Sequence, residues 1–356
     1  MNLLSYNNPF SIKKLKEGMK RLFPLVLLGL LACIPPVGMG LLPAPTVMPT
    51  LIPTASVELS PSGLPEAKLG TDNNPLILAL PPSPRPVPSA LAAGKILISL
   101  LEKSTGYKIV PVIPPDETEL VKDFGIKNAH IGVLSPIGYL LASSQGYVEA
   151  AFARQQSGAI FYGAQFIARS DAGFISYYDP IMNENGADAA VALPQFKGKK
   201  PCWTDERSPS GYIVPLGFLN DAGVQALTPA FVTDHPTVVR AVYAGGICDF
   251  GATYIDARAF PGLGDKYPDV MKKVVVIWRT PPIIPYDSLV FTPDIDEDQR
   301  RSLIRAFVDI MSTANGKSVI QTLYGFDAMQ VVQDGQYEDF RKAVKASGLD
   351  LTDLIK

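Results

Sequence analysis

The pattern of hydrophobic and polar positions separates an apolar leader and a proline-rich segment from a long body of alternating elements. In the first part of the body, apolar runs bounded by turn residues predict strands at 75–80, 107–113, 129–134 and 159–168. An amphipathic stretch predicts a helix over 90–103, and Ser135-Pro136 has the cap and first-turn residues of another. Such alternation of strands and helices predicts parallel sheets covered by helices.

The same alternation continues in a second unit that begins near Asp171. Strands are expected at 198–203, 247–253 and 274–279. Helices are expected at 212–220, 236–243, 297–313 and 337–347. Two units of this kind fit the length of the chain, because a domain of ordinary size has about 100–150 residues.

The N-terminal region has the pattern of a secretory signal. Basic residues between positions 13 and 21 precede the uncharged run 22–32, which is too short to span a bilayer comfortably. The run ends in Leu-Leu-Ala-Cys at 30–33, which resembles the lipobox of bacterial lipoproteins. That resemblance implies that Cys33 is diacylated and anchors an extracytoplasmic protein to the membrane. The alternative is an ordinary signal peptide that is cut elsewhere, with Cys33 a bystander.

Residues 34–73 are rich in proline, threonine and serine and show no sustained period of helix or strand. Such a composition cannot bury enough apolar surface to offset the entropy of ordering, so it predicts a disordered and partly extended tether. Behind a lipid anchor, a tether would let a folded domain stand off the membrane.

Composition and charge exclude several classes of function. A net charge of -2 provides no basic field for nucleic acid, and no nucleic-acid-binding motif is present. His130 and His235 are the only histidines and no zinc-type spacing occurs, so we expect neither a metal nor a cofactor. Besides Cys33 the chain contains Cys202 and Cys248. In an oxidising compartment this even pair predicts a disulfide, with two separate buried thiols as the alternative.

Polar residues follow several predicted strands, which is where ligands bind in open α/β sheets. The turn Ser-Pro-Ser-Gly at 208–211 leads from a strand into a helix, and its hydroxyls, amides and helix dipole suit an oxyanion. Simple helix capping also explains the serines of this turn, and the same two interpretations apply to Ser135. Further candidates of this kind are His235, Asp256 and Asp287. Taken one at a time, none of these signals decides between a ligand contact and a cap.

Five ordered segments together resemble the phosphate/phosphonate-type periplasmic binding proteins of ABC transporters, over residues 75–349. The segments are HIGVLSPIGYLLA, FYGAQFIARSD, DERSPSGYIVP, DHPTVVRAVYAGGICDFGAT and VIWRTPPIIPYDSLVF. The most specific of them are the serine turn and the segment WRTPPIIPYD.

The resemblance implies an α/β protein with the two-lobed type II periplasmic-binding-protein fold. Each lobe would be a mostly parallel sheet flanked by helices, and the ligand cleft would lie between the lobes. Lobe 1 would comprise 74–168 and 280–356, and lobe 2 would comprise 169–279. The fold would also bring Cys202 and Cys248 onto neighbouring strands, which favours the disulfide.

The resemblance also implies a set of ligand contacts. Ser208, Ser210 and the Gly211 amide would hold an oxyanion, with His235 reaching the same group. Pro209 stands where a threonine is usual, which removes a hydroxyl and an amide donor. The remaining expected contacts are Ser83, Ser135, Phe161 and Tyr162, together with Asp256 and Asp287 for an amino group on the ligand.

These features predict an extracytoplasmic lipoprotein that captures a small anionic or zwitterionic solute by closure of two lobes and delivers it to an ABC permease. One alternative is a sensor of the same fold that reports its ligand to a membrane signalling partner. The other alternative is an enzyme. No nucleophile elbow, Ser-His-Asp order or metal cluster supports catalysis, so we expect none.

Overall fold

The computed structural model describes residues 67–85 and 87–354. The predicted signal peptide, Cys33 and the predicted tether up to residue 66 lie outside the described residues. The last residues of the expected tether belong to the folded body. The Leu69 carbonyl accepts a hydrogen bond from the Gln299 side chain (2.7 Å), and the Gly70 carbonyl accepts one from the Lys108 amide (2.8 Å). The expected boundary at residue 73 is therefore too late, because Leu69 packs on the core of the first lobe.

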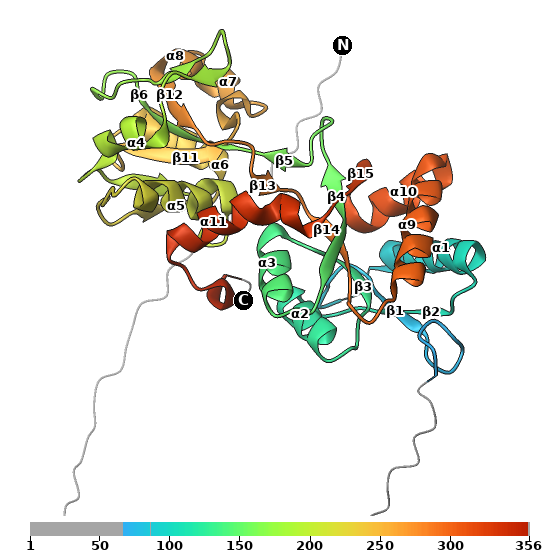
Figure 1. Cartoon of the computed structure of the whole chain (residues 1–356). Coiled ribbons are helices and arrows are strands. Elements are labelled where there is room, and N and C mark those ends of the chain that lie inside the picture. The colour runs from blue at the N-terminus through green and yellow to red at the C-terminus, as the bar shows by residue number, and fades with distance from the viewer. Residues whose placement is uncertain (1–66, 86, 355–356) are drawn as a thin grey trace, which may run out of the picture. The chain divides into compact units, whose positions relative to one another are not determined.

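The first lobe is built on a six-stranded sheet in the order β15-β4-β14-β3-β1-β2 (Figure 1). The strands are β1 (Leu76–Ala79), β2 (Ile109–Val112), β3 (Ile131–Leu134), β4 (Glu149–Gln155), β14 (Ser288–Phe291) and β15 (Ala328–Val331). β1 is parallel to β2 and β3, whereas β14 is antiparallel to β3 and β4.

Helices cover both faces of this sheet. One face packs on α1 (Pro88–Thr105), α9 (Glu297–Ser312) and α10 (Ala314–Tyr324), and the other packs on α2 (Glu117–Gly125) and α3 (Pro136–Ser144). Leu289 and Phe291 of β14 lie in the first of these cores and Val290 lies in the second, as the two-residue period of a strand requires. β14 is therefore buried on both faces at the centre of the lobe.

The second lobe is built on a five-stranded sheet in the order β10-β9-β11-β6-β12. The strands are β6 (Ala164–Arg169), β9 (Pro201–Trp203), β10 (Ala230–Phe231), β11 (Phe250–Tyr254) and β12 (Val274–Arg279). One face carries α4 (Ala189–Ala192) and α5 (Val214–Asp221), and the other carries α6 (His235–Ala244), α7 (Leu263–Lys266) and α8 (Val270–Lys273). A small hairpin of β7 (Tyr178–Asp179) and β8 (Glu184–Asn185) borders β12.

Most strands of each sheet are parallel, as expected, and the exceptions are β6, which is antiparallel to β11 and β12, and β14 and β15, which are antiparallel to their neighbours. The expected strand 159–168 is also divided at Gly163. β5 (Phe161–Tyr162) ends before this residue and β6 begins after it, and a side chain at Gly163 would crowd the Thr280 carbonyl. Since β6 belongs to the second sheet, the lobe boundary falls before Ala164 and not after residue 168.

Two further contacts join segments of the two lobes. β5 pairs with β13 (Ile284–Pro285) in a short two-stranded sheet. The helix α11 (Glu338–Ser347), which the sequence assigned to lobe 1, packs along α5 of the second lobe (Figure 1). The Asn220 side chain of α5 donates hydrogen bonds to the carbonyls of Ala346 (3.0 Å) and Ser347 (3.1 Å). The C-terminal helix therefore belongs to both lobes.

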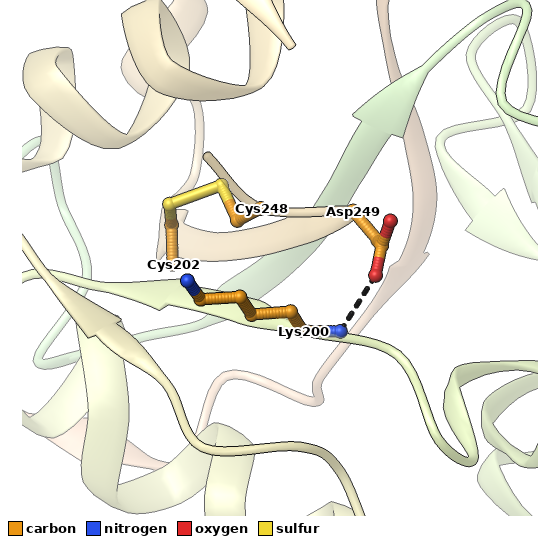
Figure 2. The surroundings of a disulfide bond; sticks show 4 residues. All are labelled: Lys200, Cys202, Cys248 and Asp249. Carbon is orange, nitrogen blue, oxygen red and sulfur yellow. Dashed lines mark hydrogen bonds between the residues drawn. A yellow bond between two sulfur atoms is a disulfide. The ribbon is translucent and has the colours of Figure 1, made fainter. Parts of the chain in front are cut away.

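Cys202 and Cys248 form the predicted disulfide, which excludes two separate thiols (Figure 2). Cys202 lies on β9, and Cys248 lies just before the neighbouring strand β11. Beside the disulfide, the Lys200 amide donates to the Asp249 carboxylate (2.7 Å) and the Asp249 amide donates to the Lys200 carbonyl (2.8 Å). Covalent and hydrogen bonds thus fix the same two segments.

Within residues 67–85 and 87–354, no helix combines the length and apolarity that crossing a membrane requires. The same part of the chain has no group of three or more His, Cys, Asp or Glu side chains that could hold a metal ion.

Candidate ligand-binding site

Most of the predicted site residues lie after strands of the two large sheets; the exceptions are Phe161 and Tyr162 on β5 and Asp287, which precedes β14. In the first lobe, Ser83 follows β1 and Ser135 follows β3, and these parallel strands end at one edge of the sheet. The Ser83 amide donates to the Pro114 carbonyl (2.9 Å), and its hydroxyl donates to the Arg85 carbonyl (2.7 Å). The hydroxyl of Ser83 is therefore used within its own turn.

Ser135 caps α3 and binds a carboxylate of the chain itself. Its hydroxyl accepts a hydrogen bond from the Gly138 amide (3.1 Å) and donates to one oxygen of Glu117 (2.9 Å). Its amide donates to the other oxygen of Glu117 (2.6 Å). Glu117, the first residue of α2, therefore occupies the donors at the start of α3, where a helix dipole favours negative charge.

The serine turn opens a short π-helix (Pro209–Ile213) that continues into α5. The Ser208 hydroxyl accepts a hydrogen bond from the Gly211 amide (3.0 Å). Its side chain therefore caps the helix, which is the alternative to a ligand contact that the sequence left open. Ser210 has an exposed fraction of 2%, and its hydroxyl lies close enough to that of Tyr162 to affect the pKa of the tyrosine. The turn is thus linked to β5, the segment that leads from the first lobe into the second.

A buried hydroxyl that sequence analysis missed lies beside this turn. Thr204 follows β9 and has an exposed fraction of 2%. Its hydroxyl has no hydrogen-bond partner in the described part of the chain, although buried polar groups nearly always have one. A side chain on Gly211 would overlap this hydroxyl, so glycine is required at that position. The position of Thr204 at the end of a strand is the signal that could have indicated it.

His235 is the first residue of α6, whose cap is Asp234. Its Nδ1 accepts a hydrogen bond from the Tyr254 amide (3.2 Å), so in the neutral ring the proton is on Nε2. Burial lowers the pKa of His235 to about 4, although the carboxylates of Asp205 and Asp234 oppose this shift. At neutral pH His235 is therefore an uncharged hydrogen-bond donor.

The two aromatic candidates on β5 have different surroundings. Phe161 packs edge-on against Tyr337, with ring centroids 5.8 Å apart, and so contributes to the core. Tyr162 stacks on Tyr286, with centroids 4.9 Å apart. Burial raises the pKa of Tyr162 to about 12, and the nearby Ser210 hydroxyl opposes that shift. Tyr162 is thus the aromatic residue of this pair that contacts the serine turn.

Asp256 has cationic partners within the chain. Its carboxylate accepts from the Arg258 guanidinium (2.6 Å) and from the Gln165 amide (2.8 Å), and Arg279 lies 3.6 Å away. Burial alone would raise the pKa of Asp256, but the hydrogen bonds from Arg258 and Gln165 outweigh it and lower the pKa. An amino group of a ligand would have to compete with two guanidinium groups, so this arrangement disfavours the expected role of Asp256.

Asp287 differs, because no described residue donates a hydrogen bond to its carboxylate. It precedes Ser288, which pairs with Leu134 across β14 and β3, so Asp287 lies beside Ser135. Burial raises the pKa of Asp287, Arg154 opposes the shift, and the charge of Glu117 adds to it. The structure therefore brings Asp287, Ser135 and Glu117 together.

A cavity of about 330 Å³ is lined by residues of both lobes. Glu117 and Ser135 line it from the first lobe, and Arg207 and Pro209 line it from the second. The arrangement can hold a small polar solute between the carboxylates and hydroxyl of the first lobe and Arg207 of the second. Sequence analysis missed Glu117 and Arg207, because their positions depend on contacts between segments that are distant in the chain.

The body has two lobes, each built on a mixed sheet, and β5 and β13 join them. Candidate ligand groups lie at strand ends of both lobes. These features define the type II periplasmic-binding-protein fold. Residues 85–337 match the family model described as ABC transporter, phosphonate, periplasmic substrate-binding protein. This chain belongs to that family.

The chain is also similar to individual known proteins. The chain is 29% identical over 200 residues to the phosphate-import protein PhnD of Mycolicibacterium smegmatis, and the match covers 52% of this chain and 56% of that protein's length. The structure is similar to that of XAC2383 from Xanthomonas citri bound to ATP, with a TM-score of 0.54, 14% identity and coverage of 82% of this chain and 100% of that chain. The comparison with PhnD1 from Prochlorococcus marinus in complex with methylphosphonate has a TM-score of 0.48 and 16% identity, and it covers 76% of this chain and 98% of that chain.

Proposed function

We propose that this chain captures a small phosphonate or phosphate-like oxyanion outside the cytoplasm and delivers it to the permease of an ABC importer. The Tyr162 hydroxyl would donate to a ligand oxygen, the Ser210 hydroxyl would exchange its contact with Tyr162 for a second ligand oxygen, and His235 would be a neutral donor. Closure of the two lobes would replace the water around the ligand by these fixed donors. Family membership and the relationship to a phosphate-import protein support this proposal.

The contact between Ser210 and Tyr162 is the observation that carries the proposal. Each residue comes from a different segment, and both hydroxyls meet at the start of the helix that continues into α5. A helix start provides a partial positive charge, so an oxyanion there needs no basic side chain. The adjacent unpartnered hydroxyl of Thr204 supplies one further donor beside the same turn.

Calorimetric titration of the mature protein with methylphosphonate, phosphate, phosphite and methanesulfonate tests the ligand class. We expect phosphorus oxyanions to bind and Ser210→Ala to weaken them by roughly 10- to 100-fold, because a hydrogen bond to a charged group contributes about 1.5–3 kcal/mol. Ser144→Ala, at the exposed end of α3, is the matched control. Binding of none of these anions would refute the ligand assignment.

We further propose that Cys33 carries a lipid that keeps the protein near its permease. Metabolic labelling with a radioactive fatty acid should mark the natural chain and leave the Cys33→Ser variant unlabelled and released.

Binding would occur without turnover, so ligand recovered from the protein after prolonged incubation should be chemically unchanged. Growth on a phosphonate as the sole phosphorus source should fail when the gene is deleted, whereas a purely sensory role would leave uptake intact.

A further inference from the structure

Glu117 occupies a position that a ligand anion would otherwise take. Its two carboxylate oxygens accept from the Ser135 amide (2.6 Å) and the Ser135 hydroxyl (2.9 Å). A side chain on Gly138, in the first turn of α3, would overlap this carboxylate. The absence of a side chain at 138 thus leaves room for Glu117 over the start of α3.

Glu117 lies in a cavity that residues next to the serine turn also line. Glu117, Asp116 and Ser135 line the cavity whose other side is formed by Arg207 and Pro209 of the serine-turn segment. Next to Ser135 across the β3–β14 pair lies Asp287, to whose carboxylate no described residue donates a hydrogen bond. The first lobe therefore presents the carboxylates of Asp116 and Glu117 and the hydroxyl of Ser135 to the cavity, and the second lobe presents Arg207.

We propose that Glu117 is a specificity-determining residue of the solute site. Its carboxylate fills the anion position at the start of α3, so the site holds one oxyanion, at the serine turn, and rejects a ligand whose other end is also anionic. This inference rests on the proposed function, because it assumes that an oxyanion binds at the serine turn.

The selectivity follows from charge and from occupied donors. A second anionic group would have to displace a carboxylate that already accepts two hydrogen bonds, and it would approach the charge of Asp287. Repulsion between unit charges a few ångströms apart in a partly buried site disfavours binding by at least about tenfold. The lining has two carboxylates, Asp116 and Glu117, against one guanidinium, Arg207, so a neutral end avoids the net repulsion and a cationic end converts it into attraction.

A purely structural role for Glu117, as the link between α2 and α3, makes a different prediction. Glu117→Gln tests it directly, because glutamine keeps the shape of the side chain and an oxygen that can accept from the Ser135 amide, while the charge is lost. The matched control is Glu119→Gln in the same turn of α2, whose carboxylate pairs with Lys122 at the surface. Thermal unfolding of each variant shows whether the fold is intact.

The experiment compares dissociation constants for methylphosphonate, 2-aminoethylphosphonate and phosphonoacetate at pH 7.5. We expect natural Glu117 to favour methylphosphonate over phosphonoacetate by at least about tenfold, and Glu117→Gln to reduce this ratio to about threefold or less. The same variant should weaken 2-aminoethylphosphonate relative to methylphosphonate. Glu119→Gln should leave both ratios unchanged.

Two outcomes separate the failure of this inference from the failure of the proposed function. If methylphosphonate binds but the ratios are the same in Glu117→Gln and Glu119→Gln, Glu117 does not set specificity and only this inference is overturned. If the natural protein binds none of the three probes, the proposed function is overturned and the inference with it.

Discussion

His235 is a residue whose environment determines both its protonation and its contribution to stability. Its pKa is about 4 in the folded protein, against an ordinary value of 6.5. Between these two pH values the unfolded chain binds more protons than the folded one, so the free energy of unfolding decreases as the pH falls. Above about pH 6.5 the contribution is complete, and it reaches roughly 3 kcal/mol at most, since one pKa unit corresponds to about 1.4 kcal/mol.

Urea unfolding of the natural protein and of His235→Gln at pH 7.5, 5.5 and 4.5 measures this effect. The natural protein should lose more stability than the variant as the pH falls through this window. His130, whose pKa burial also lowers, is present in both proteins, so the difference between them isolates His235. Identical pH dependence of the two proteins would show that His235 is not buried in its neutral form.

Pro209 limits the number of donors at the serine turn. It is the first residue of the short π-helix, lines the cavity, and has neither a hydroxyl nor an amide hydrogen. Pro209→Ala restores an amide hydrogen and Pro209→Thr restores both donors, so we expect oxyanion affinity to rise in that order, by about tenfold for threonine. Calorimetric titration with methylphosphonate checks the order. An equal affinity in all three proteins would mean that the donors at 209 do not reach the ligand.

At the scale of elements, the disulfide fixes the central strands of the second sheet. Cys202 and Cys248 are separated by 46 positions, and closing a loop of that size in the unfolded chain stabilises the fold by roughly 4 kcal/mol in the chain-entropy model. The double variant Cys202→Ala/Cys248→Ala should therefore unfold at a clearly lower urea concentration. Reducing agent should lower the midpoint of the natural protein and leave that of the variant unchanged.

The contact between α5 and α11 depends on a glycine. A side chain on Gly217 would overlap the carbonyl oxygen of Ala343, so Gly217→Ala has to push the two helices apart. We expect a loss of roughly 1–3 kcal/mol in the free energy of unfolding, as for other overpacked cores. Gly264→Ala is the matched control, because nothing lies within 4 Å of a side chain added there. Equal stability of the two variants would contradict close packing of α5 on α11.

The elements that sequence analysis predicted well are those whose own residues determine them. The apolar run 274–279 became β12 with the same bounds, and Ser135 caps a helix as its pattern predicts. The polar helix α2 was missed because it contains few apolar positions, and Leu120, Val121 and Phe124 are buried only by tertiary packing. The antiparallel direction of β6 depends on how the chain passes between the lobes, which no local pattern encodes.

In the candidate site, too, some features follow from the local sequence and others only from contacts in the folded protein. The position of Ser210 in the turn after β9 could be inferred from the chain, because strand ends carry ligands in this class of sheet, whereas Asp287 lies before the antiparallel strand β14. The pairing of Asp256 with Arg279, and that of Glu117 with Ser135, could not be inferred, because these partners meet only in the folded protein. Sequence analysis therefore named candidate residues but did not show which of their carboxylates are already paired.

At the scale of the whole molecule, α11 makes the two lobes share a core. Phe340 and Val344 of α11 lie in one cluster with Ile213 and Val214 of the second lobe and with buried residues of the first. Because neither lobe keeps this surface covered when the other unfolds, we expect the described body to unfold in a single cooperative transition.

The positions of the two tryptophans allow a direct test of this cooperativity. Trp203 and Trp278 are the only tryptophans of the chain, and both lie in the second sheet, so tryptophan fluorescence reports that lobe alone while far-ultraviolet circular dichroism reports both. The two urea transitions should coincide in the natural protein, and a bound oxyanion at 100 times its dissociation constant should move both by the same amount, about 2.7 kcal/mol. Gly217→Ala, which loosens the shared core, should separate them, whereas Gly264→Ala should not. Separate transitions in the natural protein would mean that the lobes fold independently and that α11 does not couple them.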